Sequence, residues 1–211
     1  MYVHDSNVVY IAHPKTASQS VGEALQRAGW KLRGTHHEIV EEYINADTKV
    51  LSAVREPHDL YVSWYYHHGA RKGFHEWLME YLDNPNKAIK DGDFFALERT
   101  THILFFDTIQ ESVNAALIDV GLDPIEMLRT HDAGRNGRPW QDVFSPGSMI
   151  LFNERKSDLI NMYEMLKVIR KGRLFLLTGD GNPPGPLRQF VRTICKRARL
   201  KSKIIRPWQV R

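Results

Sequence analysis

Three short apolar runs in the first half of the chain predict buried strands. They span Val8 to Ala12, Lys49 to Val54 and Ile103 to Phe106. Apolar runs of this kind, bounded by turn residues, are typical of strands that are covered on both faces. Segments with the apolar spacing of amphipathic helices follow them. The alternation predicts an α/β fold in three layers, with helices flanking a mostly parallel central sheet.

Glycines mark the ends of two predicted helices. The stripe from Val21 to Ala28 stops before Gly29, and the segment from Leu60 to His68 stops before Gly69. Glycine readily adopts the left-handed conformation that closes many helices. A further helical stripe is expected from Phe74 to Tyr81.

The second half predicts two more helices and a strand. Asp107 and Gln110, three residues apart, match a capping box that would open a helix. We expect an ordered loop over residues 132–147, a helix from about residue 153 to residue 170, and a strand over residues 174–177.

A break near residue 180 divides the chain unevenly. Residues 179–186 contain three prolines and three glycines, which interrupt regular structure. We therefore expect one α/β domain over residues 1–180 and a basic C-terminal helix over residues 181–211, packed on the domain or extending from it. A basic face is usually the solvated side of such a helix, and peripheral contact with an acidic membrane stays open as an alternative.

The composition narrows the class of ligand. The formal net charge is +4, which favours anionic ligands but does not by itself indicate nucleic acid. No apolar stretch approaches the ~20 residues of a membrane span. We also expect no leader before the first strand, because the chain lacks a basic segment followed by an apolar one there. Cys195 is the single cysteine, so an internal disulfide is excluded and a reducing, cytoplasmic location is expected.

A loop with a lysine joins the first predicted strand to the first predicted helix. Backbone amides in such a loop and the positive end of the helix dipole point at one spot, where Lys15 adds a full charge. The loop therefore predicts a phosphate or sulfate site. Its sequence is His13-Pro14-Lys15-Thr16-Ala17-Ser18-Gln19-Ser20.

Two further patterns fall at compatible positions. Arg55 stands where the second strand ends, and Ser63 follows two turns into the next helix. A guanidinium gives two parallel charge-assisted hydrogen bonds to a phosphate, so the pair predicts a second anion site beside the lysine loop. A histidine pair, His36 and His37, precedes the second strand and could supply a base near neutral pH.

These motifs resemble those of sulfotransferases that use 3'-phosphoadenosine 5'-phosphosulfate (PAPS). The segment from His13 to Thr16, followed by small residues, resembles the family's 5'-phosphosulfate loop. Val54 to Pro57, continued by Ser63 to Tyr65, resembles its 3'-phosphate motif. The likeness covers residues 7–165 and is greater to the carbohydrate-type branch. It implies a P-loop-like fold and transfer of the sulfuryl group to a hydroxyl of a carbohydrate or other small molecule, without a metal.

The resemblance also implies residue roles. Lys15 would contact the oxygen that bridges phosphate and sulfate, and Arg55 and Ser63 would hold the 3'-phosphate. The acceptor hydroxyl would lose its proton to a histidine, for which we favour His36 over His37. The residues implied around the 5'-phosphate are Thr16, Ala17, Ser18, Gln19 and Ser20, with alanine at a position where the family usually has glycine.

Two other functions stay open. A P-loop nucleotide kinase would use Lys15 on a γ-phosphate and Asp107 on magnesium, although the loop lacks the G-x-x-x-x-G-K-[ST] pattern. A non-catalytic protein could retain the nucleotide site without acceptor chemistry.

Overall fold

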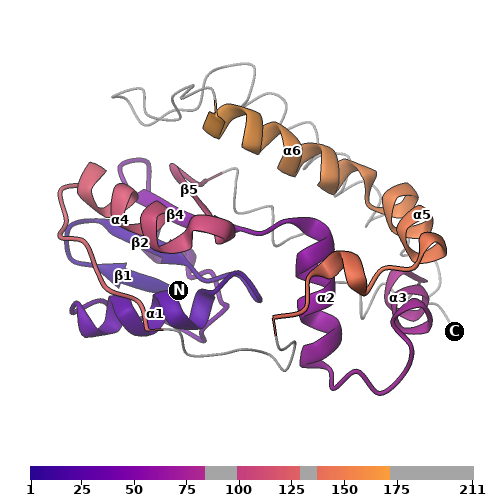
Figure 1. Ribbon diagram of the computed structural model, residues 1–211. Coiled ribbons are helices and arrows are strands. Elements are labelled where there is room, and N and C mark those ends of the chain that lie inside the picture. The colour runs from indigo at the N-terminus through magenta and orange to yellow at the C-terminus, as the bar shows by residue number, and fades with distance from the viewer. Residues whose placement is uncertain (84–98, 129–136, 172–211) are drawn as a thin grey trace, which may run out of the picture.

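The chain builds one five-stranded sheet, in the order β3-β1-β2-β4-β5 (Figure 1). The computed structural model describes residues 1–83, 99–128 and 137–171. All three predicted apolar runs become strands within one residue of their expected bounds. The strands are β1 (Tyr2–His4), β2 (Val8–Ile11), β3 (Lys31–Leu32), β4 (Lys49–Val54) and β5 (His102–Phe105).

The sheet is mixed, which corrects the expectation of a mostly parallel one. β2, β4 and β5 run parallel, whereas β1 is antiparallel to both β2 and β3. A short turn suffices to join antiparallel strands, and the turn between β1 and β2 contains Asn7 at φ 58°. Strands of two or three residues, such as β3 and β1, are too short to show an alternating pattern in the sequence.

Six helices follow or separate the strands in the described ranges. α2 begins at Pro57, because proline is favoured in the first turn of a helix and the Glu56 side chain caps this turn by accepting a hydrogen bond from the Asp59 backbone N–H at 2.6 Å. The helices are α1 (Ser18–Arg27), α2 (Pro57–His67), α3 (Phe74–Asp83), α4 (Ile109–Asp119), α5 (Pro146–Arg155) and α6 (Ser157–Lys171).

Two expectations about the later helices were wrong. The range from residue 153 to 170, expected to be a single helix, contains the end of α5 and most of α6, because the helix is interrupted at Lys156. α5 begins earlier than expected, where the Ser145 side chain caps it by accepting a hydrogen bond from the Ser148 backbone N–H. Asp107 does not open α4: it lies in a short 3₁₀ helix. Gln110, the other residue of the expected capping box, donates a hydrogen bond to the carbonyl of Ile125 and accepts one from the backbone N–H of Met127.

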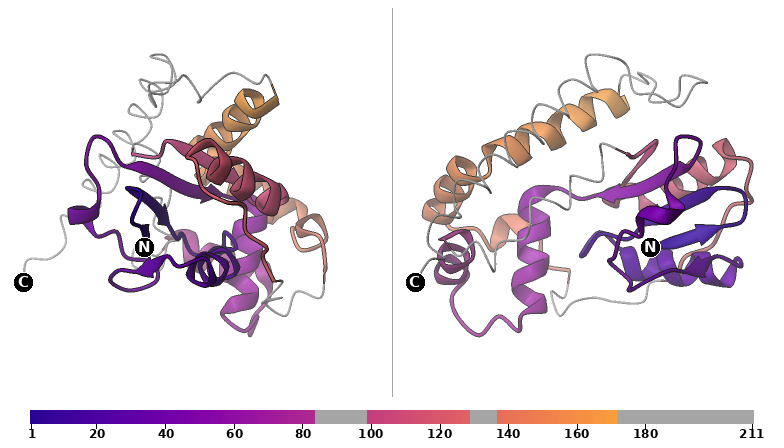
Figure 2. Two further views of the ribbon diagram at one scale, coloured as in Figure 1. Left: turned by 90° about the vertical axis from the view of Figure 1, so that its left-hand side faces the viewer. Right: turned by 180° about the vertical axis from the view of Figure 1, so that it is seen from behind.

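The apolar side chains form a core on each face of the sheet. On one face, α1 and α4 pack against β2, β4 and β5 around Tyr10, Leu51 and Leu104. On the other, α6 packs near the ends of β4 and β5, where Tyr163 lies in the same cluster as Phe105. Figures 1 and 2 show α2, α3 and α5 together to one side of the sheet, with α6 running back above it.

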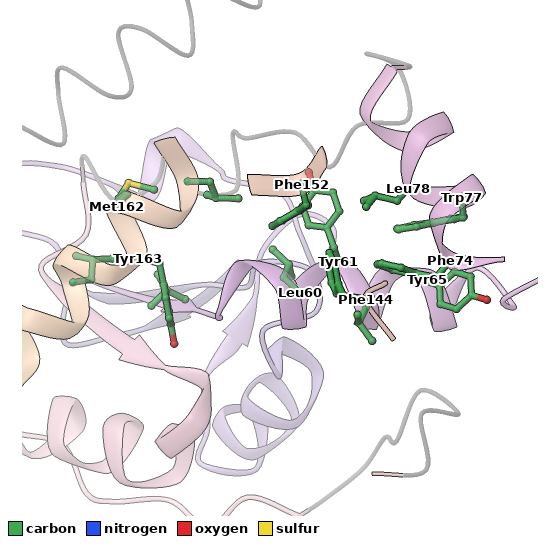
Figure 3. Packing of buried hydrophobic residues seen from close by; sticks show 14 of the residues in the cluster. Leu60, Tyr61, Tyr65, Phe74, Trp77, Leu78, Phe144, Phe152, Met162 and Tyr163 are labelled. Atoms are coloured by element: carbon green, nitrogen blue, oxygen red, sulfur yellow. The ribbon is translucent and has the colours of Figure 1, made fainter. Parts of the chain in front are cut away.

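An aromatic cluster ties α2 to α5 and to the segment that precedes α5. Tyr61 of α2 and Phe152 of α5 lie close together in Figure 3. Their ring centroids are 4.8 Å apart. His58 stacks on Trp140 at 4.6 Å and bonds Asn153 of α5 at 2.9 Å. These contacts fix α2, which carries several residues of the candidate site.

The remaining expectations concern the C-terminal part of the chain. The strand over residues 174–177, the domain boundary near residue 180 and the basic helix over residues 181–211 lie outside the described residues, as does Cys195. None of the helices among the described residues combines the length and hydropathy that a membrane span requires.

Candidate functional site

The lysine loop turns sharply between β2 and α1 through two left-handed residues. Lys15 has φ 61° and Ala17 has φ 62°. The Thr16 hydroxyl donates to the carbonyl of His13 at 2.9 Å and is buried there. Among the described residues, no side chain caps α1 and its first turn holds no acid. Its first amides therefore point outward at the positive end of the helix, as an anion site requires.

Ala17→Gly should raise the free energy of unfolding by about 0.5–1 kcal/mol. Glycine removes the steric cost of the left-handed conformation, and this gain exceeds the stability that is lost because glycine gives the unfolded chain more conformational entropy. Glycine is also the better residue at this helix start. Denaturant unfolding measures the change.

Ala28→Gly is the matched control at the other end of α1. Ala28 has φ −83°, so glycine relieves nothing there and should destabilise by a few tenths to about 1 kcal/mol. If the two substitutions changed the free energy of unfolding equally, the result would contradict the claim that Ala17 is strained.

Arg55 joins the lysine loop to α2. Its Nη1 donates to the carbonyl oxygen of Lys15 at 2.8 Å, and its Nε donates to Asp59 at 2.5 Å. The guanidinium lies 3.9 Å from the ring centroid of Phe106, beyond the end of β5. β2 and β4 are parallel neighbours, so their carboxyl ends share one edge of the sheet. The structure thus brings Lys15 and Arg55 together.

The other predicted anion-binding residues lie on the two helices that leave this edge. Ser63 is 6% exposed and stands one turn beyond Asp59, on the same side of α2. Ser18 is buried in the first turn of α1. Gln19 is exposed and its amide donates to Glu23 at 3.1 Å, so its side chain is directed along the helix. Ser20 is half-buried in the same turn.

Two aromatic or basic residues of the site were not identified from the sequence. The Lys15 ammonium lies 5.9 Å from the ring centroid of Trp64, and the His67 ring meets Trp64 edge-on at 5.7 Å. The signal was present, since both follow Ser63 within one helical turn.

The cations of the site repel one another. Burial and then the charge of Arg55 lower the pKa of Lys15. Burial, followed by the charges of Lys15 and His68, lowers the pKa of His67. A bound anion would relieve this repulsion, so the cluster favours an anionic ligand.

The two candidate histidines differ in the nitrogen that they can offer. His37 is exposed, and its Nδ1 lies 2.7 Å from the carbonyl oxygen of Ala12. A carbonyl only accepts, so Nδ1 carries the proton and the Nε2 lone pair is left to act as a base. His36 bonds the Tyr2 hydroxyl through Nδ1 at 2.7 Å, and its Nε2 is buried without a partner among residues 1–83, 99–128 and 137–171.

Asp107, considered as a magnesium ligand in the kinase alternative, forms an ion pair with Arg170 instead. Both oxygens of its carboxylate accept from Arg170 Nη1, at 2.9 and 3.0 Å. The second guanidinium nitrogen of Arg170 donates to Thr108 at 2.5 Å. Asp107 therefore ties α6 to the end of β5, which weakens the kinase alternative.

Comparison with known proteins identifies no relative of this chain. No family model, no curated protein and no solved structure matches the chain.

Proposed function

We propose that the protein is a PAPS-dependent sulfotransferase with a P-loop-like nucleotide site. The observation that carries the proposal is the hydrogen bond from Arg55 to the Lys15 carbonyl at the shared edge of β2 and β4. It makes neighbours of two basic residues that the resemblance assigns to opposite ends of one nucleotide. The single cysteine supports a cytoplasmic location as part of the same proposal.

In the proposed reaction, the acceptor oxygen attacks the sulfur in line with the bridging oxygen of PAPS. The new S–O bond forms as the bond from sulfur to the bridging oxygen breaks, and adenosine 3',5'-bisphosphate leaves. The acceptor proton passes to His37 Nε2. Lys15 and the first amides of α1 stabilise the charge that develops on the leaving phosphate, which is the main demand of such a transfer.

The base assigned here is His37, whereas the sequence favoured His36. The exposed ring of His37 has a free lone pair on Nε2, and its Nδ1 is anchored to Ala12, directly before the lysine loop. His36 engages Tyr2 and buries its second nitrogen. Tyr2 and His36 instead support the ring beside them, since the two histidine rings meet edge-on at 4.5 Å.

The test is transfer of labelled sulfate from PAPS to pools of carbohydrate, phenolic and lipid acceptors. Wild type should label one pool, and His37→Ala should lower kcat by about 10²- to 10⁴-fold, the usual contribution of a general base. His36→Ala is the matched control and should lower kcat far less. Binding of nucleotide without transfer to any pool would favour the non-catalytic alternative, and equal losses in both variants would contradict the choice of base.

A further inference from the structure

Asp59 is the carboxylate that fixes the orientation of Arg55. The side chain of Asp59 is 15% exposed and that of Arg55 is 9% exposed, so their ion pair is largely removed from water. A planar guanidinium bonded through both Nε and Nη1 cannot rotate without losing a contact. The pair therefore aims the Nη1–H at one place, which is the carbonyl oxygen of Lys15.

The peptide that receives this bond is strained. A left-handed conformation is unfavourable for a residue with a Cβ, which comes too close to the following carbonyl oxygen, and such residues persist where their surroundings hold them. Lys15 and Ala17 are both left-handed, with Thr16 between them. Loss of the bond to the Lys15 carbonyl would free the peptide between Lys15 and Thr16 and, with it, the direction of the lysine side chain.

We infer that Asp59 is a positioning residue that acts through Arg55 to hold the Lys15 loop in its transfer-competent conformation. The inference rests on the proposed function for its catalytic consequence, but not for the link from α2 to the loop. None of the residue roles implied by the resemblance includes Asp59. Its effect on the reaction is indirect, because the contact with the loop is made by Arg55.

Two consequences of Asp59 oppose each other in the proposed reaction. Its negative charge lies beside the cation assigned to the 3'-phosphate, so it weakens nucleotide binding by repulsion. Its hydrogen bond to Arg55 orders the lysine loop and so favours transfer. Removal of the charge should therefore tighten nucleotide binding while it slows turnover. General damage to the fold would weaken both.

The experiment compares Asp59→Asn and Asp59→Ala with Asp119→Asn in the full chain. Asp119 is a suitable control because its carboxylate also bonds a basic side chain, His102, at 2.8 Å, but on α4 and β5. Hydrogen exchange of the amides of residues 15–18 should accelerate about tenfold in Asp59→Ala. It should accelerate less in Asp59→Asn, which keeps an oxygen for Arg55, and stay unchanged in the control.

Kinetics with PAPS supply the second readout. Asp59→Asn should lower kcat several-fold and also lower the Kd of adenosine 3',5'-bisphosphate several-fold. Unchanged exchange in the loop would overturn the link from Asp59 to Lys15. Loss of kcat and of affinity together would overturn its role as a positioning residue. Failure of wild type to bind the nucleotide would overturn the proposed function, while the exchange result still decides the link.

Discussion

Lys15→Ala should lower sulfate transfer from PAPS by about 10²- to 10³-fold, the usual loss when one group that stabilises developing charge is removed. Thermal stability should change little, because alanine keeps the Cβ that strains this position and Lys15 makes its bond to Arg55 through the backbone carbonyl. The measurement is kcat for labelled sulfate transfer, with Tm recorded for the same preparation.

Two variants sharpen this result. Lys31→Ala removes a more exposed lysine, whose ammonium pairs with Asp5 at 3.0 Å on the edge strand β3, and it should leave kcat unchanged. Lys15→Met keeps the apolar length of the side chain without its charge and should be as inactive as the alanine variant. A fall in Tm that parallels the fall in kcat would instead mark Lys15 as structural.

Arg55→Lys should reduce the preference for adenosine 3',5'-bisphosphate over AMP by about 10- to 100-fold. Lysine retains a positive charge but gives up the paired hydrogen bonds that a guanidinium makes to a phosphate, each worth about 1.5–3 kcal/mol when charged. Stability should fall as well, because an ammonium cannot bond Asp59 and the Lys15 carbonyl in the same geometry. Calorimetric titration with both nucleotides measures the preference.

Arg27→Lys provides the control for this substitution. Arg27 ends α1 and donates to the carbonyl of Glu126 at 3.1 Å, away from the lysine loop at the helix start. The control should retain the preference for the bisphosphate. An Arg55→Lys variant that also retains it would remove Arg55 from the nucleotide site and leave it a structural link between β4, α2 and the loop.

The sequence predicted the elements that position the site, because local signals marked them. β4 coincides with its apolar run from Lys49 to Val54, and α2 ends before Gly69 as expected. Parallel pairing of β2 and β4 follows from the helix between them, and it places Lys15 and Arg55 at the same edge of the sheet.

Contacts between segments distant in the chain could not be predicted in this way. Nothing in the pattern indicates that Arg55 donates to the Lys15 carbonyl, or that Asp107 binds Arg170 rather than opening α4. The choice between the two histidines depended on which nitrogen each ring buries, and adjacent positions in an irregular loop carry no periodicity that would show it. His37 is distinguished by its bond to Ala12, a contact across twenty-five positions.

Calorimetric titration of the wild-type chain without added metal shows whether one nucleotide bridges the lysine loop and Arg55. Adenosine 3',5'-bisphosphate should bind at least about tenfold more tightly than AMP, since the second phosphate adds charge-assisted hydrogen bonds worth about 1.5–3 kcal/mol. Equal affinity for the two nucleotides would contradict the account, because the site would then recognise only the 5'-phosphate.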